Sequence, residues 1–65
     1  GMPTVKPLGK GLYEVRSNLA NRIARVFFGV KHGKMILLHI IIKKSQKTPS
    51  KDLSIARDRL RKIGG

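Results

Sequence analysis

The chain has 65 residues, of which fifteen are Lys or Arg and three are Asp or Glu, so its formal net charge is +12. A chain this short has room for one thin core layer, and its length leaves too few residues for a second domain. It contains no cysteine that could form disulfides, and His32 and His39 cannot complete a four-ligand zinc site alone. We therefore expect no metal or other cofactor. The excess of positive charge indicates a polyanionic partner, either nucleic acid or an acidic protein.

Three strands are predicted after an irregular segment over residues 1–11, in which prolines and glycines oppose regular structure. Apolar and polar residues alternate over Leu12–Ser17 and again over Arg22–Val30, as half-buried strands require. Met35–Ile42 is almost wholly apolar, which favours a central strand covered on both faces. Short connections between these segments predict a three-stranded antiparallel meander.

One helix is predicted after the strands. Thr48 suits the N-cap position and Pro49 the first helical position. The residues that would form its apolar stripe are Leu53, Ala56, Leu60 and Ile63. The predicted fold class is therefore α+β, with the meander followed by one C-terminal helix in a single domain over residues 1–65. Gly1 is expected to be a remnant of tag cleavage, with Met2 as the native start.

The chain shows no pattern that would direct it to a membrane or out of the cell. No apolar stretch is long enough to cross a bilayer, and no basic segment precedes an apolar one as in a signal peptide. We expect a cytoplasmic protein without a membrane partner.

The residue types allow RNA cleavage more readily than other enzyme chemistry, because it needs positive charge and a proton-transfer group rather than paired carboxylates. The candidates are Arg16, Arg25, His39, Lys43, Lys44, Gln46 and Lys47. A plainer interpretation stands beside each type of candidate. A strand arginine is often a solvated charge, a histidine in an apolar strand is more often a core residue, and a lysine run is usually a solvated loop.

Four segments carry a resemblance to a known family: GLYEVR over residues 11–16, RVFF over 25–28, ILLHIIIKKSQKTP over 36–49 and IARDRL over 55–60. Together they resemble the phage-derived, HigB-like branch of the RelE/ParE toxin superfamily. The similarity covers residues 7–62, and its most specific piece is KKSQKTP, which looks like the KKTQKTP motif at a strand end of that branch.

The resemblance implies a small cytoplasmic toxin encoded beside an antitoxin. HigB and RelE types are mRNA interferases that cleave mRNA on the ribosome, whereas ParE types act on gyrase. Carried over by motif, Arg16 and Arg25 would stabilise the transition state as catalytic residues. Lys43, Lys44 and Lys47 would bind RNA, and His39 is the candidate for proton transfer. The alternatives are a non-catalytic basic module that binds RNA or an acidic antitoxin, and a ParE-like gyrase inhibitor.

The family pattern includes an N-terminal strand and helices before the GLYEVR-like segment, and this sequence does not contain them. A sheet without those elements would keep an unpaired edge and an uncovered apolar face. We therefore predict a homodimer, with sheet faces packed together or with strands paired or swapped between chains.

Overall fold

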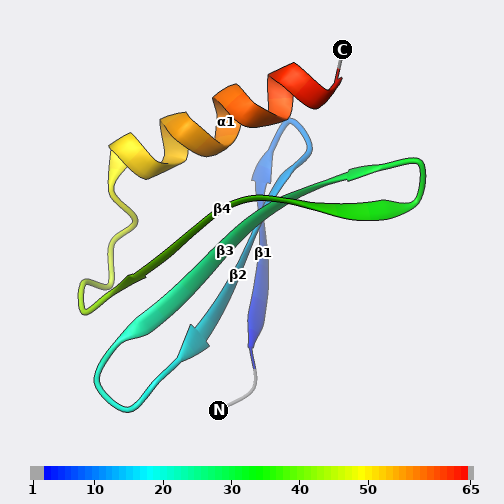
Figure 1. Ribbon diagram of the computed structural model, residues 1–65. Coiled ribbons are helices and arrows are strands. Elements are labelled where there is room, and N and C mark those ends of the chain that lie inside the picture. The colour runs from blue at the N-terminus through cyan, green and yellow to red at the C-terminus, as the bar shows by residue number, and fades with distance from the viewer. Residues whose placement is uncertain (1–2, 65) are drawn as a thin grey trace.

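A computed structural model describes residues 3–64 of the protein. A four-stranded antiparallel sheet in the order β1-β2-β3-β4 is followed by one helix (Figure 1). The elements are β1 (Thr4–Gly9), β2 (Leu12–Asn18), β3 (Ile23–Lys31), β4 (Lys34–Lys43) and α1 (Ser50–Gly64). Helix α1 lies across one face of the sheet, as Figure 1 shows. The expectations for Gly1 and Met2 concern residues outside the described range.

The prediction of three strands and an irregular N-terminal segment was wrong, because β1 forms an additional edge strand. Val5 of β1 pairs with Val15 of β2, and Pro7 pairs with Tyr13. An edge strand tolerates proline, because its outer N–H groups need no partner within the sheet. Gly9 and Gly11 have φ angles of 92° and 81° in the turn to β2, where glycine avoids steric strain. Residues that suggested an irregular segment are therefore those of an edge strand and a tight turn.

The three predicted strands are found as β2, β3 and β4, but the central position predicted for the apolar strand was also wrong. β4 is the other edge of the sheet, and α1 covers only one of its faces. Leu37, Ile40 and Ile42 therefore remain 58%, 56% and 52% exposed. A continuous apolar strand suits a position with both faces covered, but the sequence of the strand does not show whether a second element covers its other face.

The core lies between α1 and the sheet. Its buried members are Leu12, Phe27, Leu38, Ile41 and Ala56, with Leu8, Ile36, Leu53, Leu60 and Ile63 packed against them. The predicted apolar stripe of the helix thus does face the sheet. At the closest approach, a Cβ on Gly29 would lie 2.6 Å from Leu60 Cδ1. The absence of a side chain at Gly29 lets α1 pack directly on β3.

The helix begins later than the sequence predicted. The carbonyl of Pro49 accepts hydrogen bonds from the N–H groups of Asp52 and Leu53, at 3.1 and 3.2 Å, so Pro49 occupies the N-cap position. Thr48 does not cap the helix, because its hydroxyl donates to Glu14 instead. Between residues 3 and 64, no helix has the length and apolar character needed to traverse a bilayer.

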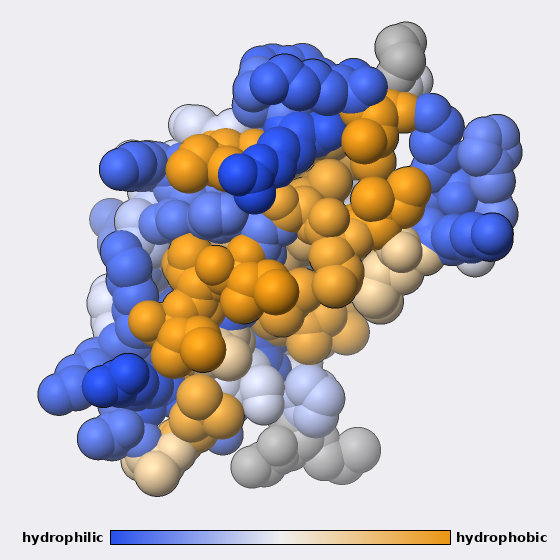
Figure 2. Space-filling view, viewed as in Figure 1, coloured by the Kyte–Doolittle hydropathy of each residue, from blue (hydrophilic) through white to orange (hydrophobic). Residues whose placement is uncertain are grey.

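The sheet face opposite α1 is largely uncovered. Its exposed apolar side chains include Val5, Val30, Met35, Leu37, Ile40 and Ile42. Figure 2 shows an apolar band across the sheet, bordered by hydrophilic side chains. The total accessible surface of the chain is 4760 Å². A compact chain of this mass would expose roughly 4,200 Å², so the excess is consistent with one missing cover.

Candidate nucleic-acid interface

A buried ion pair lies beneath the loop that leaves β4. Arg25 of β3 has no exposed side-chain surface, and Glu14 of β2 is 1% exposed. Arg25 Nε is 3.6 Å from Glu14 Oε2, and Arg16 Nε donates to Glu14 Oε1 at 2.6 Å. One buried carboxylate therefore pairs with two guanidinium groups, which leaves the cluster with one excess positive charge. Such a group of charges is held in place firmly, because removing one member leaves another charge buried and unpaired.

The same pair anchors the loop over residues 44–49, which contains most of the KKSQKTP motif. Arg25 donates from Nη1 to the carbonyl of Ser45 at 3.0 Å and from Nη2 to the carbonyl of Gln46. Thr48 Oγ1 donates to Glu14 Oε2 at 2.8 Å. Two contacts from the sheet to loop carbonyls and one to the Thr48 side chain thus hold the loop in place.

The lysines of this loop stay at the surface. Lys43 is 51% exposed, and Lys44 and Lys47 are also exposed. No ion pair found between residues 3 and 64 involves Lys44 or Lys47. Their charges are therefore available to an external anion, while the backbone that bears them is held by buried contacts.

The predicted site residues fall into two groups. Arg16 is 34% exposed at its side chain and is joined through Glu14 to Arg25. Arg25 is wholly buried, and its described contacts are with Glu14 and the loop carbonyls. His39 lies apart from this group on β4, where its side chain is 16% exposed and contacts α1.

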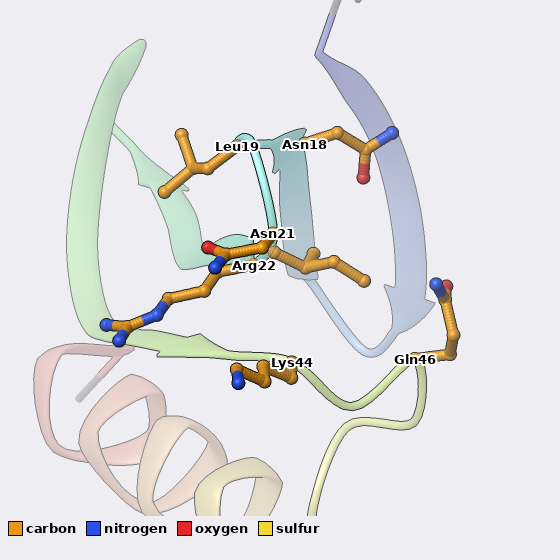
Figure 3. A pocket seen from close by; sticks show the side chains of 7 residues that line it. Asn18, Leu19, Asn21, Arg22, Lys44 and Gln46 are labelled. Carbon is orange, nitrogen blue, oxygen red and sulfur yellow. The ribbon is translucent and has the colours of Figure 1, made fainter.

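The turn between β2 and β3 contributes a residue that the sequence prediction missed. A shallow hollow of about 230 Å³ is lined by Asn18, Leu19, Asn21, Arg22, Ile23, Lys44 and Gln46 (Figure 3). The Arg22 side chain extends from this turn toward the end of β4, as Figure 3 shows. In an antiparallel meander, the turn between the second and third strands lies beside the end of the fourth. That register argument could have identified Arg22.

Five basic side chains are therefore found at this end of the sheet, which we call the basic end. They are Arg16, Arg22, Lys43, Lys44 and Lys47. The acidic residues do not neutralise it fully. Glu14 is buried with its arginines, and Asp58 pairs with Arg61 and Lys62 on α1 at 2.7 and 3.2 Å.

Asp52 is the third acidic residue and joins the basic end to His39. Its Oδ1 is 2.7 Å from His39 Nε2, and its Oδ2 is 3.9 Å from Lys43 Nζ. The hydrogen bond from His39 is the main cause that lowers the pKa of the Asp52 carboxyl, with Lys43 adding a Coulomb contribution. Asp52 is thus an anion that holds an imidazole and a lysine at the start of α1.

Comparison with known protein families supports part of the resemblance carried by the four sequence segments. Residues 1–61 match the family described as phage-derived protein Gp49-like (DUF891). The chain belongs to this family. The Gp49-like family is related to the RelE-like toxins of toxin–antitoxin pairs, whose partner is an antitoxin. No curated protein and no solved structure gives a significant match to this Gp49-like chain.

Proposed function

We propose that this Gp49-like chain is a toxin that binds mRNA through its basic end and cleaves it on the ribosome, as HigB and RelE types do. The observation that carries the proposal is the buried Glu14–Arg25 pair, which holds the lysine-bearing loop from below. Loops rich in lysine are usually mobile, and ordering them on binding costs conformational entropy. A loop that is ordered in advance avoids part of this cost when it binds a polyanion.

The roles of the two strand arginines differ in this proposal. Arg16 is partly exposed and is assigned to a phosphate of the bound RNA. Arg25 is assigned as a positioning residue, because its guanidinium is wholly buried beneath the loop and donates to two loop carbonyls. Lys43, Lys44 and Lys47 supply the exposed charges for the RNA backbone.

RNA binding by the basic end is tested with a pair of matched double variants. Lys44→Ala with Lys47→Ala removes two exposed charges from the basic end. Lys10→Ala with Lys34→Ala removes two exposed lysines, one in the turn before β2 and one at the start of β4, at the opposite end of the sheet. Each lost phosphate contact lowers the salt dependence of single-strand binding by about 0.7, so the first variant should lose about 1.4 from the slope of log K against log salt. Equal losses in the two variants would contradict a localised interface.

Cleavage is tested by controlled expression in bacteria with mapping of mRNA ends. We expect growth arrest and new mRNA ends within translated regions, both weakened by the double variant at Lys44 and Lys47. RNA binding with intact mRNA would favour the non-catalytic module. Loss of DNA supercoiling with intact mRNA would favour a gyrase inhibitor.

We also propose that the chain is a homodimer packed through the apolar sheet face. Its exposed side chains, among them Val5, Leu37 and Ile40 at 59%, 58% and 56% exposure, form the kind of uncovered apolar patch that marks a protein interface. This face is formed by apolar strand residues, so a second copy is able to cover it without burying lysines. The antitoxin is the alternative occupant, and a solution mass measured without it separates the two.

A further inference from the structure

A β-bulge gives His39 its position. In the pairing of β3 with β4, Phe27 lies opposite His39 and Phe28 lies opposite Leu37, so Leu38 has no counterpart. The extra residue interrupts the alternation of side chains and directs both Leu38 and His39 to the side covered by α1. Leu38 enters the core, and His39 contacts Asp52. Bulges are frequent beside active sites, because they redirect a single side chain.

The hydrogen bond to Asp52 leaves the other nitrogen of His39 as an acceptor. Asp52 Oδ1 is 2.7 Å from His39 Nε2, and an ionised carboxylate only accepts hydrogen bonds. Nε2 therefore donates, and in the neutral imidazole the lone pair lies on Nδ1. An acceptor nitrogen held by a carboxylate in this way is the arrangement of a general base.

A cation lies beside that nitrogen. Arg59 of α1 donates from Nη1 to the carbonyl of Leu38, the bulged residue, at 2.7 Å, and the same Nη1 is 3.4 Å from His39 Nδ1. Arg59 takes part in no ion pair found within residues 3–64. Its remaining N–H groups are therefore available to a phosphate, which guanidinium binds in a bidentate manner.

The two side chains border a hollow at the outer edge of β4. It has a volume of about 360 Å³ and is lined by Leu37, Leu38, His39, Ile40 and Arg59. This volume falls in the range of roughly 300–1,000 Å³ that ligand pockets occupy. His39 precedes Lys43 by four residues on the same strand, a distance of about 13 Å. An RNA strand held at the basic end is thus able to continue along β4 into this hollow.

We propose that His39, Asp52 and Arg59 form the RNA-cleaving site of the protein. This inference rests on the proposed function and adds where the chemistry takes place. Arg59 binds the scissile phosphate, and His39 Nδ1 takes the proton of the neighbouring ribose 2′-OH. The 2′-oxygen forms a bond to phosphorus while the bond from phosphorus to the 5′-oxygen breaks, and that oxygen takes a proton from water. The products are a 2′,3′-cyclic phosphate and a 5′-OH. Asp52 is a positioning residue that fixes the imidazole.

The test measures single-turnover cleavage of an mRNA on purified bacterial ribosomes by the full chain. His39→Ala should lower the rate by roughly 100-fold or more, the usual contribution of a general base. Imidazole added to the buffer should restore part of the lost rate, which a merely structural histidine would not allow. Asp52→Asn should lower the rate constant of cleavage at saturating RNA, whereas the loss of its negative charge beside Lys43 should not weaken RNA binding. Arg59→Lys should weaken cleavage because a lysine cannot form the bidentate contact.

The matched control is Arg61→Lys, an exposed residue of α1 that pairs only with Asp58 in the contacts found, and its rate should equal that of the wild type. Circular dichroism of each variant verifies folding. Three results would overturn the inference while leaving cleavage itself in place. They are a wild-type rate in His39→Ala, failure of imidazole to restore activity in a folded His39→Ala chain, and a product with a 5′-phosphate. A wild-type chain that binds RNA but does not cut it would overturn the proposed mRNA cleavage together with this site.

Discussion

Removal of the buried Arg25 guanidinium should cost the protein much of its free energy of unfolding. Arg25→Met deletes the hydrogen bonds to the carbonyls of Ser45 and Gln46 and leaves Glu14 buried with fewer partners. Breaking a buried pair on one side costs about 3–5 kcal/mol. A domain of 65 residues has a free energy of unfolding of roughly 3–10 kcal/mol at 0.05–0.15 kcal/mol per residue. The variant should therefore be close to the unfolding threshold.

A second variant separates stability from loop placement. Glu14→Leu combined with Arg25→Met replaces the buried charges with apolar groups, an exchange that is often neutral or stabilising. The double variant should recover most of the stability that Arg25→Met loses, yet its loop over residues 44–49 has lost its anchors. Its loop amides should exchange hydrogen faster, and its affinity for RNA should fall.

Urea unfolding measures the free energies, and hydrogen exchange follows the loop. A loss below about 1 kcal/mol in Arg25→Met would refute the energetic role given to the pair, since that is the size of an ordinary hydrogen bond. A double variant with unchanged loop exchange and unchanged RNA affinity would refute the positioning role of Arg25.

Three further changes test the fold, the charges and the assembly. Because the hydrogen bond from His39 lowers the folded-state pKa of Asp52, the unfolded chain binds more protons near that pKa, and stability should fall as pH drops below about 4. In Asp52→Asn, the free energies of unfolding measured by urea titration at about pH 3 and about pH 6 should therefore differ less than they do in the wild type. Gly29→Ala should cost about 1 kcal/mol in urea unfolding, since the added methyl meets Leu60 and that side chain must turn away. Ile40→Asp should convert a dimer to a single chain by sedimentation, because it places a charge in the apolar face.

Controls for these variants come from positions that lack the relevant contact. Gly64→Ala places its methyl in open space, so it should leave stability nearly unchanged. Ser54→Asp adds the same charge as Ile40→Asp on the exposed side of α1 and should leave the assembly intact. A wild-type mass equal to one chain at micromolar concentration would contradict the dimer, and a Gly29→Ala chain as stable as the wild type would contradict the close packing of α1. An equal response to pH in Asp52→Asn and in the wild type would contradict the role of its ion pair.

Much of the fold was predictable because its periodicities are local. The alternation over Leu12–Ser17 and the helical spacing of Leu53, Ala56, Leu60 and Ile63 correspond to β2 and to the buried face of α1. β1 was missed because Pro7 and Gly9 act as breakers by local rules, whereas an edge strand tolerates them. The edge position of β4 was missed because an apolar run does not reveal how many faces are covered.

The candidate site depended more on tertiary structure. Arg16 and Arg25 have the same charge and similar strand contexts in the sequence, yet one is partly exposed and the other is fully buried. The difference arises because Arg25 lies under the loop after β4, which no local pattern records. Asp52 and Arg59 were not singled out, because their relation to His39 exists only once α1 packs on the bulged strand.

The sequence by itself determined the charge, the location of β2, β3 and β4, the amphipathic helix and the family, since each depends on composition or on short-range order. Only the tertiary structure decided which cations remain exposed, which one anchors the loop, and how the bulge in β4 directs His39 to the helix. The physical reason is that burial and ion pairing join residues distant in the chain. Their free energies are set by the packed arrangement and not by neighbouring residues.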